Sequence, residues 1–131
     1  GNWFNLPYAI TYFYNVYGPR EISTGKYATL IALFKEKYKQ GLPLTVVSPG
    51  TQKRNFTYID DIINALVLIG EHGYGDEFGI GSDESFSILE VAKMFGTDIE
   101  ILPERQGNRM TNISNIKYFS FCFDFINVTT F

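Results

Sequence analysis

The chain has 131 residues, of which 45% are hydrophobic and 19% charged, a composition typical of one folded domain with a modest core. The formal net charge is −3 and no basic stripe is present, so neither a nucleic-acid-binding nor a membrane-surface role is predicted. Cys122 is the only cysteine, which excludes an intrachain disulfide and a cysteine-based metal cage, and no metal site is predicted. No charged-then-apolar leader and no apolar run of membrane-spanning length occur, so we expect a cytoplasmic protein.

The first half of the chain predicts a strand, a helix and a second strand. Residues 8–14 form an unbroken β-branched and aromatic run, and a continuous apolar strand of this kind predicts burial on both faces, as in a parallel sheet. Apolar residues recur at helical spacing over residues 27–38, and Gly41 is expected to end that helix. Residues 44–47 predict a short strand.

The second half continues the alternation of helices and strands. Asp60 and Asp61 stand where a helix N-terminus favours carboxylates, and the helix that follows is apolar nearly all round, which predicts that it is buried. Residues 77–80 predict a strand. The spacing Ser87-x-x-Glu90 fits a capping box that opens a third helix, and residues 98–102 predict the last strand. The pattern as a whole predicts an α/β fold.

Three polar stretches adjoin these predicted elements. Asn15-Val16-Tyr17-Gly18-Pro19-Arg20 leaves the first strand, residues 50–61 lead into the second helix, and residues 103–108 follow the last strand. In this order and spacing they resemble the Asn-x-x-Gly-Pro, Gly-x-x-x-Arg-(Asp/Asn)-aromatic-x-x-(Val/Ile)-x-Asp and Arg-x-Gly-(Asp/Asn) patterns of the extended short-chain dehydrogenases. That family contains the NAD-dependent nucleotide-sugar epimerases and 4,6-dehydratases. The resemblance covers about residues 3 to 110.

The resemblance implies a division of the chain. Residues 1–20 would be the end of a partial Rossmann-type domain with its last parallel strands, and residues 21–110 the small C-terminal α/β substrate-binding domain. Residues 111–131 depart from the family, because phenylalanines at alternate positions replace the expected charged helix. Our hypothesis is that this tail is out-of-frame or non-native sequence, and its alternation is typical of an aggregation-prone strand.

The resemblance also implies a binding site for a nucleotide-diphosphate sugar. Arg54 and Arg105 stand at positions that the family uses for the diphosphate, whose oxygens a planar guanidinium can hold through paired, charge-assisted hydrogen bonds. The alternative for both arginines is surface solubility. Asn15 lies just past a predicted parallel strand, where ligands bind in open α/β sheets, and its amide would contact the phosphate or the sugar. The alternative for Asn15 is a turn residue.

Four further residues acquire roles by the same resemblance. Phe13 and Tyr14 would border the nicotinamide end of the cofactor, with core packing as the alternative. Val46 and Val47 resemble the strand that walls the nucleotide base. His72, the only histidine, has no evident acidic partner and is expected to be exposed and uninvolved.

Two features of the family's enzymes are absent from this sequence. No glycine-rich strand-to-helix turn occurs that could bring backbone N–H groups to a dinucleotide pyrophosphate. None of the nine tyrosines has a lysine four residues later, so the proton-transferring Tyr-x-x-x-Lys pair is missing, and residues 1–5 resemble the tail of the helix that would carry it. No catalytic residue is therefore predicted.

We accordingly expect the chain to be the substrate-binding portion of an enzyme, inactive alone and without tight NAD(P) binding. The resemblance implies that the intact parent binds NAD(P) and forms a homodimer. Two other readings stay open: a non-catalytic nucleotide-sugar-binding or scaffold domain, and a degenerate gene fragment.

Overall fold

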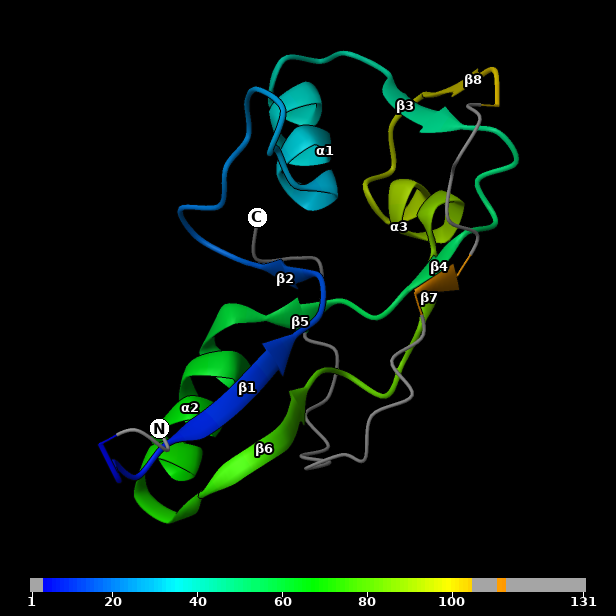
Figure 1. The fold of residues 1–131 in the computed structure, drawn as a ribbon. Helices are drawn as coiled ribbons and strands as arrows, with labels where there is room; N and C mark the ends of the chain where they lie inside the picture. Colours follow the sequence, from blue (N-terminus) through cyan, green and yellow to red (C-terminus); the bar gives the residue numbers. More distant parts are fainter. Residues whose placement is uncertain (1–3, 105–110, 113–131) are drawn as a thin grey trace.

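The computed structural model describes residues 4–104 and 111–112, and in this part of the chain short strands alternate with helices (Figure 1). In chain order the elements are β1 (Ala9–Phe13), β2 (Val16–Tyr17), α1 (Leu30–Lys39), β3 (Leu44–Val47), β4 (Lys53–Arg54), β5 (Thr57–Tyr58), α2 (Ile59–His72), β6 (Gly75–Ile80), β7 (Phe86–Ser87), α3 (Ile88–Met94), β8 (Ile99–Leu102) and β9 (Thr111–Asn112). This confirms the predicted α/β fold, and every element expected from the sequence is present within a few residues of its predicted bounds.

The ends of the helices follow from their capping residues. Thr29 is the N-cap of α1, and its Oγ1 accepts a hydrogen bond from the backbone N–H of Ala32 at 3.3 Å, so the helix begins later than the periodicity predicted. At α3 the predicted capping box is confirmed: the Ser87 side chain accepts from the backbone N–H of Glu90, and the Glu90 carboxylate accepts from the backbone N–H of Ser87. The C-cap of α2 is Gly73.

The strands pair mainly in parallel. β1 pairs with β6, β2 with β5, and β3 with β8, all in parallel, whereas β4 lies between antiparallel β7 and parallel β9. Parallel strands end at the same edge of a sheet, so the loops that follow β1 and β6 emerge side by side. Figure 1 shows β2 and β5 lying just beyond that edge.

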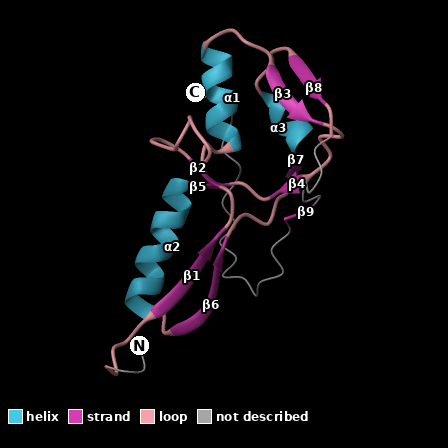
Figure 2. Ribbon diagram, turned by 45° about the horizontal axis from the view of Figure 1, so that its top comes forward, coloured by secondary structure: helices cyan, strands magenta, loops and turns pink. Residues whose placement is uncertain are grey.

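Two hydrophobic cores stand on either side of the β2–β5 pair (Figure 2). The larger core is formed by α1, β3, α3 and the segment before β5, and its buried residues are Ile31, Phe34, Leu44, Val46, Phe56, Val91 and Ala92. The smaller core lies between α2 and the β1–β6 pair, and its buried residues are Ile62, Ile69 and Ile80. The β2–β5 pair forms a bridge that contacts both cores, because Val16 of β2 packs against the smaller core and Tyr17 of β2 against the larger one.

Two burial predictions were wrong. β1 was expected to be covered on both faces, but Ile10, Tyr12 and Phe13 are 40%, 42% and 47% exposed. α2 was expected to be buried nearly all round, but within it only Ile62 and Ile69 are buried. The reason is the same for both: in the described part of the chain β6 is the only strand beside β1, and α2 covers one face of that pair. The apolar residues of a segment determine which of its surfaces can be buried, but the neighbouring elements determine which of those surfaces are in fact buried.

None of the helices in residues 4–104 is long and apolar enough to cross a membrane. Of the predicted tail, residues 111–131, the structure describes Thr111 and Asn112, which form β9, and the predictions for residues 113–131 lie outside the described residues.

Candidate functional site

The first two motif stretches meet at the carboxyl ends of β1 and β6. Phe13 and Ile80 are partners in the parallel register and are the last residues of their strands. Asn15 follows β1, Ser82 follows β6, and β5 brings Thr57 to the same place through its pairing with β2. This edge is where ligands bind in open α/β sheets.

Asn15 is held on both its backbone and its side chain. Its φ is +41°, in the left-handed region that asparagine tolerates better than most residues. Its carbonyl accepts from the backbone N–H of Thr57 at 3.4 Å, and its Nδ2 donates to the carbonyl of Asn55 at 3.1 Å. A carboxamide nitrogen carries two N–H groups, so within the described residues one N–H and the Oδ1 of Asn15 make no other hydrogen bond.

Asn55 and Thr57 connect the same region to the loop after β6. Asn55 is 3% exposed, and its Nδ2 donates to the carbonyl of Ser82 at 2.8 Å. Thr57 is 5% exposed, its Oγ1 donates to the carbonyl of Tyr14 at 3.4 Å, and it accepts from the backbone N–H of Ser82 at 3.1 Å. We call this set of residues, Tyr14, Asn15, Asn55, Thr57 and Ser82, the polar clasp.

Arg54 directly precedes the clasp residue Asn55. It lies half-buried in β4, where it pairs with Phe86 of β7, and its Nη1 donates to the carbonyl of Lys53 at 3.2 Å. Because Asn55 is tied to the loops after β1 and β6, the backbone that carries the Arg54 guanidinium is fixed relative to Asn15. The structure therefore brings these two predicted site residues into one neighbourhood.

The other predicted site residues are distributed around this point. Phe13 ends β1 with an exposed ring, and Tyr14 contributes its carbonyl to the clasp and is half-buried. Val46 is completely buried in the larger core, whereas the neighbouring Val47 is half-buried at the end of β3. Arg105 lies outside the described residues.

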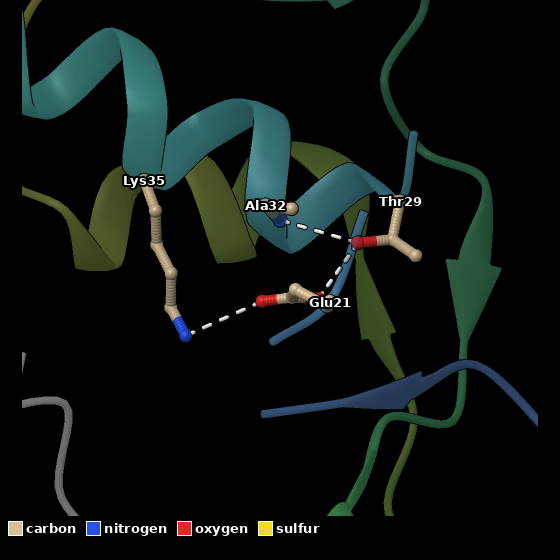
Figure 3. Close-up of polar contacts among 4 residues, drawn as sticks. All are labelled: Glu21, Thr29, Ala32 and Lys35. Carbon is tan, nitrogen blue, oxygen red and sulfur yellow. Dashed lines mark hydrogen bonds and ion pairs between the residues drawn. The ribbon is translucent and has the colours of Figure 1, made fainter. Parts of the chain in front are cut away.

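Sequence reasoning missed the residues that anchor the loop between β2 and α1. Figure 3 shows Glu21 between two partners: one carboxylate oxygen accepts from Thr29 Oγ1 at 2.7 Å, and the other lies 3.3 Å from Lys35 Nζ. The Glu21 side chain is only 11% exposed, so this loop is fastened to the first turns of α1. A carboxylate eight residues before a helix-capping threonine was the available signal.

An aromatic pair completes the bridge between the two cores. The rings of Tyr17 and Tyr58 lie 5.4 Å apart at 58°. Burial, together with the nearby carboxylate of Asp61, raises the pKa of Tyr17 above its usual 10.0, so its hydroxyl is protonated at neutral pH. His72 is exposed, as expected, but it does have an acidic neighbour that was not expected, because its Nε2 lies 3.8 Å from a carboxylate oxygen of Glu71. Within the described residues no three His, Cys, Asp or Glu side chains gather as a metal site would require.

Comparisons with known proteins identify the family. A model of the NAD dependent epimerase/dehydratase family matches residues 2–81. UDP-N-acetyl-alpha-D-glucosaminuronate decarboxylase from Bacillus cytotoxicus is 39% identical over 89 residues, a match that covers 67% of this chain and 27% of the relative. UDP-glucuronic acid decarboxylase 6 from Arabidopsis thaliana is 31% identical over 114 residues, covering 79% of this chain and 32% of the relative. The chain belongs to the NAD-dependent epimerase/dehydratase family.

Solved structures agree with this assignment. UDP-glucose 4-epimerase from Thermotoga maritima, determined with UDP-glucose, superposes with a TM-score of 0.79 at 28% identity, over 88% of this chain and 39% of the epimerase chain. UDP-glucuronic acid 4-epimerase from Bacillus cereus, determined with UDP-glucuronic acid and NAD, gives a TM-score of 0.72 at 29% identity, over 86% and 38% of the two chains. The chain thus spans about a third of the length of its relatives.

Proposed function

We propose that this chain supplies the substrate-binding portion of a nucleotide-sugar epimerase or dehydratase. The observation that carries the proposal is the meeting of Asn15 and the Arg54 segment at the carboxyl ends of two parallel strands, joined by the clasp. Two of the three polar motifs therefore converge on the edge of the sheet where a ligand is expected. The family membership and the relatives solved with UDP-sugars support the same assignment.

The chemistry of binding follows from the residue types. Arg54, together with Arg105, would hold the two phosphates of the ligand through charge-assisted hydrogen bonds, which planar guanidinium groups form in pairs. Asn15 would donate its remaining N–H to a phosphate or sugar oxygen. Val47, at the end of β3, would meet the nucleotide base, with Val46 supporting it from the core. These contacts position a substrate and do not by themselves break a bond.

The chemical step requires parts that this sequence does not contain. NAD(P), when bound, supplies reversible hydride transfer. The exposed ring of Phe13 at the end of β1, with Tyr14 beside it, fits the border of a nicotinamide, but the sequence has no glycine-rich turn to hold the pyrophosphate of the cofactor. The sequence also has no Tyr-x-x-x-Lys pair. We therefore assign catalysis to the intact parent enzyme and propose that this chain alone is inactive.

A second candidate function is a non-catalytic nucleotide-sugar-binding domain. The observation that favours it is that the larger core and the polar clasp are both completed by described residues of this chain. A binding site can therefore be assembled without the parts that perform catalysis. A measurable turnover of a UDP-sugar by the chain with added NAD would exclude this candidate.

Calorimetric titration with UDP-glucose, dTDP-glucose and GDP-mannose tests the proposed site. Removing the charge of Arg54 with Arg54→Gln should weaken binding about 10- to 100-fold, because a hydrogen bond to a charged group contributes about 1.5–3 kcal/mol. Lys53→Gln removes a neighbouring, exposed charge at a position that the motif leaves unspecified and is the matched control, with an expected change of less than about twofold. Unchanged affinity in the Arg54→Gln, Arg105→Gln double variant would refute the proposed site.

A further inference from the structure

Thr57 and Asn55 are two buried polar residues whose side chains form hydrogen bonds within the candidate site, although the family patterns do not assign them to the ligand. Thr57 and Asn55 are 5% and 3% exposed, so both side chains are buried within the folded chain. Within the described residues, their side chains form hydrogen bonds only to the loops after β1 and β6. We propose that Thr57 and Asn55 are positioning residues, which hold Asn15 and Arg54 in the arrangement that binds the diphosphate. This inference rests on the proposed function.

The hydroxyl of Thr57 is the centre of the arrangement. It donates to the carbonyl of Tyr14 and accepts from the backbone N–H of Ser82, so one oxygen joins the ends of both parallel strands. The backbone N–H of the same residue donates to the carbonyl of Asn15. A valine at this position would have the same shape but would leave the part-buried carbonyl of Tyr14 and the part-buried N–H of Ser82 without this partner, and unpaired polar groups away from water are costly.

Asn55 fixes the orientation of the Asn15 side chain. Its backbone carbonyl accepts one of the two N–H groups of the Asn15 carboxamide, which leaves the second N–H and the oxygen directed elsewhere. The side chain of Asn55 is itself held in place, because its Nδ2 donates a hydrogen bond to the carbonyl of Ser82, and only the amide nitrogen of the carboxamide can donate. Asn55 is also the residue after Arg54, so one clamped residue sets the direction of two proposed ligand contacts.

The clasp lies between the two hydrophobic cores, which explains why its loss should affect binding more than folding. Asn15 precedes Val16, which packs against the smaller core, while Arg54 is followed two residues later by Phe56 of the larger core. The proposed ligand contacts Asn15 and Arg54 are therefore attached to different cores, and the polar clasp sets the distance between these two residues. A binding constellation loses effect when its members move by about 1 Å.

Titration of the chain with UDP-glucose tests this inference. Thr57→Val should weaken binding about five- to tenfold, as expected for the loss of a positioning hydrogen bond, and Thr57→Ser, which keeps the hydroxyl, should restore it. Thr51→Val makes the same chemical change at an exposed threonine of the preceding loop and should bind as the unchanged chain does. Asn55→Ala provides a second variant should Thr57→Val fail to fold.

A double-mutant cycle separates positioning from general stability. If Thr57 and Asn55 position both Asn15 and Arg54, then Thr57→Val or Asn55→Ala should weaken binding less in an Asn15→Ala background than in the unchanged chain, because one of the two contacts that they position is already gone. Additive losses, undiminished binding by a folded Thr57→Val or Asn55→Ala chain, or no rescue by Thr57→Ser would overturn the inference. Failure of the unchanged chain to bind any of the three nucleotide sugars would instead refute the proposed function.

Discussion

Replacing Gly50 with alanine should separate backbone strain from steric crowding at the head of the Arg54 motif. Gly50 has φ +72°, and a Cβ at this position would lie 2.7 Å from Val46 Cγ1 and 3.3 Å from Leu89 Cβ. Placing an L-residue in the left-handed region costs about 1 kcal/mol or slightly more, and crowding a packed core adds about 1–3 kcal/mol. We therefore expect Gly50→Ala to lower the free energy of unfolding by about 2–4 kcal/mol.

Gly41 provides the matched control. Its φ is +65°, close to that of Gly50, but nothing lies within 4 Å of a Cβ built there. Gly41→Ala should therefore show the backbone cost alone, about 1 kcal/mol, and any gain from a stiffer unfolded chain is common to both variants. Urea unfolding followed by circular dichroism gives both values. A difference between the two variants smaller than about 0.5 kcal/mol would show that Val46 and Leu89 yield freely and would refute the steric reasoning.

Three further changes test the helix ends and their ionisation. Ser87→Ala should lower the free energy of unfolding by about 1 kcal/mol, measured by urea unfolding, because it removes the N-cap of α3. Hydrogen bonds from Ser87 lower the pKa of Glu90 below its ordinary 4.5, so its carboxylate stabilises the fold above pH 4.5 and this contribution is lost as the pH falls through the lowered pKa. Glu90→Gln should accordingly narrow the stability difference between neutral and acidic pH in urea titrations. Burial, and next the charge of Asp60, raise the pKa of Asp61 above 3.8, so its ionisation costs stability as the pH rises through the raised pKa. Asp61→Asn should stabilise the fold at neutral pH and should have no such effect below pH 3.8, which thermal unfolding at the two pH values would measure. If Asp61→Asn instead destabilised the fold at neutral pH, the favourable interaction of the carboxylate with the start of α2 would outweigh the cost of its burial.

Local sequence signals predicted the elements well, because each depends on residues close together in the chain. The capping box at Ser87 and the strand at Leu44–Val47 are examples. Burial was predicted less well. The runs that form β1 and α2 are apolar on nearly all sides, but their exposure depends on which elements lie beside them.

The residues of the candidate site likewise fall into those that the sequence predicted and those that it did not. The motifs identified Asn15 and Arg54, and the structure brings their segments together. Their spacing said nothing of Thr57 or Glu21, whose roles depend on partners 43 and 8 residues away in the chain. The hydroxyl of Thr57 connects loops that are far apart in the chain and leaves no periodic signature, so only the folded arrangement reveals its role.

The arrangement of the two cores gives a physical reason why the proposed binding residues of this chain can keep their places. The smaller core leaves the apolar residues of β1 and α2 exposed, whereas the larger core buries Phe34, Leu44 and Val46 almost completely. Local opening is expected where apolar burial is least, and therefore on the side of β1 and α2. Asn15 stands at that side, but its hydrogen bonds run to Asn55 and Thr57, next to Phe56 of the larger core. The proposed ligand contact that is most subject to local opening is thus joined by hydrogen bonds to the side of the chain with the larger core.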